Sequence, residues 1–150
     1  MKEIYYTYNN EAIACCVFLS ALKQVQTIDV PRSCLLLPFL LDDRTVSYLQ
    51  RVGNEHISME NLIKSQPRLF SSFNKRFTTL LPITINTLMI LSKSNQIEVT
   101  KAISLKENNV QGDIDISDRF NEIRKALPIL MRMIENYDTT QLYKLLRIQL

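Results

Sequence analysis

The amino-acid sequence predicts a mainly α-helical domain with a small β-hairpin, an α+β fold that forms one compact domain over residues 1–150. Apolar residues recur at spacings of three and four over several segments, which is the pattern of helices buried along one face. Residues 97–105 and 113–117 instead alternate apolar and polar side chains, as half-buried strands do. With 150 residues, of which 46% are hydrophobic and 22% charged, the chain can bury a single core without disulfides or metals.

The first predicted elements are an extended segment and a long apolar helix. Ile4 to Tyr8 is rich in Tyr and Ile, so we expect a short strand or an extended arm there. Asn10 is a good N-cap for a helix that runs to about Gln26. This helix is apolar nearly all round from Ala12 to Leu22, which predicts that it is buried in the core or sandwiched by a partner subunit.

The next segment is an apolar run followed by a capped helix. Cys34 to Leu41 is too short for its periodicity to decide between a strand and a buried helix. Asp42 or Asp43 can cap a helix from Arg44 to Arg51. Gly53 supplies the end of that helix.

Prolines divide the centre of the chain into further helices. Ser58 begins a short helix that Pro67 ends, and Pro67 itself can occupy the first turn of the next helix. By the same logic, Pro82 separates that Phe-rich helix from a helix over Ile83 to Ser94, and the two meet at an angle. The face that the Phe-rich helix buries is predicted to consist of Leu69, Phe70, Phe73, Phe77, Leu80 and Leu81.

A hairpin is predicted after these helices. The first strand covers residues 97–105, a loop follows over Lys106 to Gly112, and the return strand covers Asp113 to Ser117. Asp113, Asp115 and Ser117 also imitate the start of a calcium loop, but the glycine that such a loop needs is missing. Helix, helix and hairpin in this order give a winged-helix-like segment.

Two further helices complete the predicted fold. Ser117 caps the first, and Pro128 inside it is expected to kink or restart the helix. Asp138 or Thr139 caps the last. The helix that Ser117 caps carries a stripe of apolar residues that could pack equally well in the core or against a partner helix. The stripe consists of Phe120, Ile123, Leu127, Leu130 and Ile134.

Residue types that carry catalysis lack the spacing that their chemistry needs. Cys15, Cys16 and Cys34 lie in apolar sequence without zinc-ligand spacing, and we interpret them as buried thiols. His56 is the only histidine and is interpreted as a surface residue. The chain has two glycines and no glycine-rich phosphate loop, so ATP binding is not expected. We assign no catalytic, cofactor-binding or metal-ligating residue and expect a protein that is not an enzyme.

The small net charge of +3 is unevenly distributed, with basic residues gathered between residues 64 and 106. Ordinary solvated faces are one explanation. The other is contact with nucleic acid or an acidic partner, for which the candidates are Lys75, Arg76, Lys93 and Lys101. A winged-helix regulator that binds DNA on its own is therefore an alternative function. Its weakness is that the outward positions of Ile83 to Ser94 carry no Arg to grip guanine or phosphate.

The expected compartment is the cytoplasm, without membrane contact. The N-terminus replaces the basic and apolar regions of a secretory signal with an acidic residue and tyrosines. The longest apolar runs are shorter than the roughly 20 residues that a membrane helix needs.

Four segments together resemble one family, the middle component of bacterial three-component ABC systems. In order, they are YNNEAI (residues 8–13), LLPFLLDDRT (36–45), PRLFSSFNKRF (67–77) and LYKLLRI (142–148). The sequence departs from the family where Glu11 stands in place of a common Pro. It departs again where Arg147 stands in place of a Gly near the end.

The resemblance implies a non-catalytic adaptor or regulatory subunit in a hetero-oligomer. Such a subunit links an SMC/Rad50-like ABC ATPase to an effector, often a nuclease, in defence against phage or plasmids. Lamassu-type systems are the best-known example. DNA contact would be made through the complex, and the family offers no catalytic residues to transfer to this chain.

Overall fold

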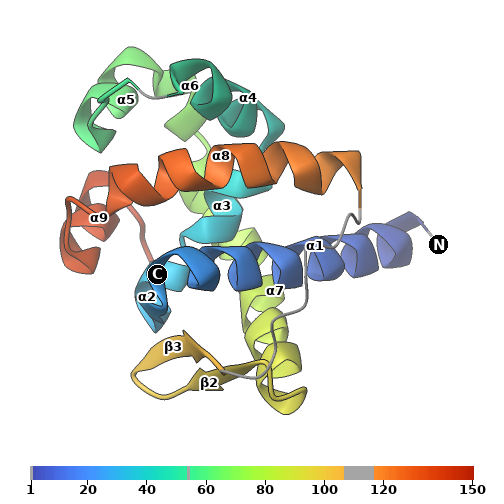
Figure 1. Cartoon of the computed structure of the whole chain (residues 1–150). Helices are drawn as coiled ribbons and strands as arrows, with labels where there is room; N and C mark the ends of the chain where they lie inside the picture. The colour runs from blue at the N-terminus through green and yellow to red at the C-terminus, as the bar shows by residue number, and fades with distance from the viewer. Residues whose placement is uncertain (1, 54, 107–116) are drawn as a thin grey trace.

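Within the described residues, helices form most of the structure, and a short three-stranded sheet lies at one end (Figure 1). The computed structural model describes residues 2–53, 55–106 and 117–150, with only the helical backbone for residues 2–9. The predicted fold class is confirmed. In chain order the elements are α1 (Lys2–Val25), β1 (Thr27–Asp29), α2 (Val30–Ser33), α3 (Leu36–Leu40), α4 (Asp43–Val52), α5 (Met59–Ser65), α6 (Pro67–Phe70), α7 (Phe73–Lys93), β2 (Ile97–Val99), β3 (Ala102–Leu105), α8 (Asp118–Ile134) and α9 (Thr139–Leu145).

The core lies where α8 packs between α4 and α1, while α7 crosses behind α1 (Figure 1). Short α3 fills the centre and contacts α1, α4, α7 and α8, so Leu36, Leu37 and Leu40 have no exposed surface. The apolar run whose strand or helix character the sequence left open is therefore a buried helix, apolar on every side because helices enclose it. The expected burial of α1 is also confirmed, with Val17 and Phe18 fully buried.

Local capping signals place several helix ends as predicted. Asp42 accepts a hydrogen bond from the N–H of Thr45 and caps α4. Ser58 and Ser117 cap α5 and α8 in the same way. Asp138 forms a reciprocal capping box with the third residue of α9. Gly53 ends α4 with a positive φ of 57°, a conformation that glycine adopts without strain.

Of the three prolines predicted to divide helices, only Pro67 does so, because α5 ends at Ser65 and Pro67 occupies the first turn of α6. Pro82 lies inside α7, so the two helices predicted to meet at that proline are one helix, and the winged-helix arrangement is not formed there. The helix break lies earlier, at Ser71 and Ser72 between α6 and α7. Pro128 likewise lies inside α8, and no new helix begins there. An interior proline costs a helix about 3 kcal/mol. Both rings are exposed, and burial of apolar residues on both sides of each proline, such as Phe77 and Leu88 in α7, offsets that cost.

The sheet differs from the predicted hairpin. Residues 97–105 form two strands rather than one, because the chain turns at Thr100 and Lys101, where the Thr100 N–H donates to the Ala102 carbonyl over 2.9 Å. The turn lets Ile97 and Ile103 both enter the core. The predicted loop and return strand, residues 106–117, lie outside the described residues except for their first and last.

The third strand, β1, was not predicted. β1 pairs antiparallel with β3, with Ile28 opposite Ile103, and the strand order is β1-β3-β2. The start of the chain also differs, because α1 is already helical at Lys2 where an extended arm was expected, and Asn10 lies within the helix instead of capping it. No proline or glycine interrupts residues 2–25, so the helix can extend back to the start of the chain. The preference of the Tyr and Ile residues for a strand is weak compared with the extension of a helix whose later turns already pack against the core.

Candidate interaction surfaces

The three lysines singled out in the sequence lie on separated parts of the surface. Lys75 and Lys93 are exposed near opposite ends of α7, and Lys101 is exposed in the turn between β2 and β3. Lys93 lies 18 positions after Lys75, which is five helical turns or roughly 27 Å along the axis. The two α7 lysines thus share a helix face without forming a compact basic patch.

Arg76, the fourth candidate, is directed into the molecule. Its guanidinium donates to the carbonyls of Pro38 at 3.2 Å and Leu69 at 3.0 Å, and to the Ser72 hydroxyl at 3.1 Å. It also stacks on the Phe73 ring, 5.3 Å from the centroid. Burial lowers the pKa of Arg76, but an arginine remains charged at any ordinary pH. Arg76 therefore ties α3 and α6 to α7.

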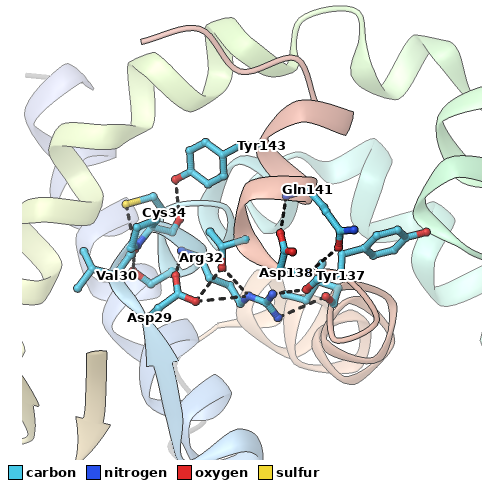
Figure 2. A network of polar contacts seen from close by, with 12 residues as sticks. Asp29, Val30, Arg32, Cys34, Tyr137, Asp138, Gln141 and Tyr143 are labelled. Atoms are coloured by element: carbon cyan, nitrogen blue, oxygen red, sulfur yellow. Dashed lines mark hydrogen bonds and ion pairs between the residues drawn. The ribbon is translucent and has the colours of Figure 1, made fainter. Parts of the chain in front are cut away.

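A second inward-facing arginine, Arg32, organises a network of polar contacts among the described residues (Figure 2). Arg32 donates through Nη1 to the Ile134 carbonyl at 3.3 Å, through Nη2 to the Tyr137 carbonyl, and through Nε to the Thr139 hydroxyl at 3.2 Å. Asp29 accepts from the Arg32 N–H and from the Thr139 hydroxyl, each at 2.7 Å. We call these residues the Arg32 clamp, because they fix the α8–α9 junction to β1 and α2.

Tyr143 reinforces the clamp from α9. Its hydroxyl donates to the Pro31 carbonyl at 2.6 Å, and its ring packs edge-on against Phe77, with centroids 5.7 Å apart. Burial, with the neighbouring Cys34 and Asp29, raises the pKa of the Tyr143 phenol well above its usual range. The neutral phenol is thus the form that the folded chain favours.

The three thiols are free and half-buried. Burial raises the pKa of Cys15 to about 11, and burial also raises the pKa of Cys16 and of Cys34. Since the thiolate is the nucleophile and the metal ligand, these protonated thiols are poorly suited to either role at neutral pH. No group of three potential metal ligands occurs among the described residues. His56 is exposed, as predicted.

Two apolar surfaces open to solvent. Ile85, Met89 and Ile90 on the outward side of α7 are 50%, 49% and 44% exposed, and we call them the α7 apolar face. A groove of about 840 Å³, the α5–α9 groove, has the apolar Ile63, Phe70, Leu145 and Leu146 among its lining residues. Its rim includes Lys64, Lys144 and Arg147 against Glu60. The two surfaces lie at different ends of the molecule, since the second half of α7 lies beside the sheet and α5 and α6 lie away from it (Figure 1).

A third surface is polar and was missed in the sequence. A groove of about 450 Å³ between α4 and α6 is lined by Arg44, Ser47, Tyr48 and Arg51 from α4 and by Arg68 from α6. We call it the basic groove. The one sequence signal for it was the seven-residue spacing of Arg44 and Arg51, which places both on one face of a helix. Arg68 joins them only through the tertiary fold.

Among the described helices, none combines the length and apolar character required to traverse a lipid bilayer. The model of one protein family, ABC-three component (ABC-3C) system Middle Component 3, matches residues 2–150. Neither a curated protein nor a solved structure matches the chain. The resemblance to a middle component of three-component ABC systems is therefore confirmed at the level of the family.

Proposed function

Because the chain belongs to the Middle Component 3 family of ABC-three component systems, we propose that it is a non-catalytic adaptor that links an SMC/Rad50-like ABC ATPase to an effector. The observation that carries the proposal is the family match over residues 2–150. The family description makes the chain one part of a three-part system, and the adaptor role explains why such a part would present several separate surfaces.

The α7 apolar face supports docking to one partner. Three large apolar side chains about half exposed on one helix are expensive to leave in water, and such groups commonly mark protein interaction sites. Val99 on β2, which packs beside α7, is 40% exposed and extends the apolar character of this region. Burial of these side chains under a partner would contribute favourably to association.

The α5–α9 groove supports docking to a second partner. Its apolar lining with a cationic rim suits an amphipathic segment that carries acidic residues. Two surfaces at different ends of the molecule are what a linking subunit requires, since one partner must not block the other.

The chemistry of the described residues supports a role without catalysis. Arg32 and Arg76 are bonded to main-chain carbonyls and side chains of the same chain. The half-buried thiols of Cys15, Cys16 and Cys34 favour the protonated form. The two arginines are thus engaged within the fold, which leaves the surfaces described above as the candidate binding sites.

The biological setting that we propose is defence against phage or plasmids, in a Lamassu-type assembly with a nuclease as the effector. The support is the resemblance described above, carried by segments that span nearly the whole chain. Loss of the chain should then remove protection, which plaque counts on cells that carry the complete system or the system without this chain would measure.

Co-purification tests the docking surfaces. The tagged chain is co-expressed with the ATPase and the effector, and the eluate is analysed by size-exclusion chromatography. We expect all three proteins in one peak. The double variant Ile85→Asp/Met89→Asp should lose one partner and keep the other, because charges on the α7 apolar face cannot be buried without cost.

The matched control is Thr79→Asp/Asn136→Asp, which adds the same charge at exposed polar positions that belong neither to the α7 apolar face nor to the lining of the α5–α9 groove. Both partners should remain bound to the control. A chain that elutes as a monomer beside both neighbours would refute the adaptor role. Equal loss of a partner in both double variants would show that added charge, and not the α7 apolar face, is what matters.

A further inference from the structure

The basic groove differs in chemistry from the two apolar surfaces. Arg44, Arg51 and Arg68 line it, and Asp43 is the only acidic residue in its lining. Asp43 already faces Arg119, whose Nε lies 3.7 Å from a carboxylate oxygen. In the described part of the chain, neither Arg51 nor Arg68 forms an ion pair, while Arg44 lies 3.9 Å from Asp42. Within the described residues, the groove lining therefore carries three arginines against one aspartate, and Arg51 also borders a neighbouring hollow that contains Asp118 and Glu122.

The positions of the arginines suit a row of phosphates. Arg44 and Arg51 are seven residues apart on α4, which is two helical turns or roughly 10 Å. One strand of a DNA duplex carries a phosphate about every 3.4 Å along its axis, so about three phosphates span that distance. Guanidinium groups bind phosphate oxygens with two parallel hydrogen bonds, which a lysine cannot do.

A protein partner suits this groove less well. An apolar protein surface would find little apolar area to cover, because the groove lining holds mainly Arg, Ser, Gln and Asp side chains and its Leu69 is buried. An acidic polypeptide is the protein partner that the competition experiment below distinguishes from DNA. A single-stranded nucleic acid is also disfavoured. Such strands use several aromatic faces for base stacking, whereas this groove offers one aromatic ring, Tyr48, and the Arg51 guanidinium already lies over one of its faces, 5.7 Å from the centroid.

We propose that the basic groove between α4 and α6 is a binding site for the phosphate backbone of duplex DNA, held by Arg44, Arg51 and Arg68. The site reads charge and spacing, not base sequence, because phosphate contacts carry no sequence information. It shares no lining residue with the α7 apolar face or the α5–α9 groove, although α6 contributes residues to both grooves. The inference rests on the groove alone and does not depend on the adaptor role.

Fluorescence anisotropy of a short labelled DNA duplex, titrated with the purified full-length chain, tests the site. The triple variant Arg44→Gln/Arg51→Gln/Arg68→Gln should bind at least roughly tenfold more weakly at physiological salt. A plot of log affinity against log salt should lose about 2.7 units of slope, from three phosphate contacts at 0.9 each.

The matched control, Lys75→Gln/Lys93→Gln/Lys101→Gln, removes the same charge at exposed positions elsewhere and should retain nearly wild-type affinity and slope. Arg51→Gln/Arg68→Gln leaves the Arg44–Asp42 pair intact and should reduce the slope by about 1.8 units, two-thirds of the reduction expected for the triple variant.

Three results would overturn the proposal. One is the absence of duplex binding by the wild-type chain at low salt. Another is an equal loss of affinity in the arginine and lysine triple variants, which would reveal binding through overall charge. The third is polyglutamate that competes as well as DNA at equal charge, which would assign the groove to an acidic polypeptide.

Discussion

The Arg32 clamp and the basic groove use the same side chain in opposite ways. Arg32 is largely enclosed, and its three nitrogens donate to acceptors of the same chain. Arg51 and Arg68 are exposed, and in the described residues no carboxylate pairs with them. An arginine thus holds the fold in one region and is free to bind in the other. Both roles use arginine, so the residue type does not distinguish them. They differ in how many hydrogen-bond acceptors of the same chain the guanidinium reaches.

Replacement of Arg32 by Ala should produce the largest loss of stability. Two main-chain carbonyls and a hydroxyl lose their donor, and Asp29 loses its cationic neighbour. We expect the free energy of unfolding to fall by about 2–4 kcal/mol, measured by urea denaturation followed by circular dichroism. Arg32→Lys should recover only part of the loss, because one ammonium cannot reach all three acceptors. A loss near zero would mean that the clamp does not hold α9.

Arg76→Ala should be the next most damaging change. It removes donors from the carbonyls of Pro38 and Leu69 and the stacking on Phe73. We expect a loss of about 1–3 kcal/mol in the same denaturation experiment. DNA affinity should remain at the wild-type level in the fraction that is folded. A variant that is fully stable but binds DNA weakly would contradict the inward-facing role, because Arg76 would then act in DNA binding and not in the fold.

Tyr143 should make the clamp sensitive to alkaline pH. Burial raises its pKa in the folded state above the usual value of about 10, so its stabilising contribution is complete below that pH and is lost as the pH rises further. Tyr143→Phe should cost about 1 kcal/mol at neutral pH by removing the bond to Pro31. The variant should also show a shallower fall of unfolding free energy above pH 10. Parallel pH profiles would contradict this assignment.

The smallest stability effect is expected in the basic groove. Arg51→Gln/Arg68→Gln changes exposed side chains that form no ion pair with the described residues, so the free energy of unfolding should stay within about 0.5 kcal/mol of wild type. The same variant should weaken DNA binding. A stability loss as large as that of Arg32→Ala would erase the distinction between the two regions.

The sequence predicted what local chemistry decides. Helix caps at Asp42, Ser58, Ser117 and Asp138 were predicted because each side chain satisfies N–H groups within its own helix. The fold class followed from hydrophobic periodicity. Pro82 was misread as a boundary because its local cost is visible in the sequence, whereas the burial that offsets it comes from distant elements.

Contacts between segments that are distant in the chain could not be predicted from the sequence. β1 has three residues, too few for a pattern, and its partner strand β3 lies about 75 residues away in the chain. The inward direction of Arg76 depends on Pro38, and the basic groove depends on α6 bringing Arg68 to α4. The candidates Lys75, Lys93 and Lys101 were placed on the surface as expected, but nothing in the sequence showed that they lie apart.

The most direct test of the adaptor role asks whether the two partners meet without this chain. The tagged effector and the ABC ATPase are co-expressed with and without it, and the effector is captured and its bound proteins are quantified. The adaptor account predicts that the ATPase is recovered with the effector only when this chain is present. Equal recovery of the ATPase in its absence would contradict the account.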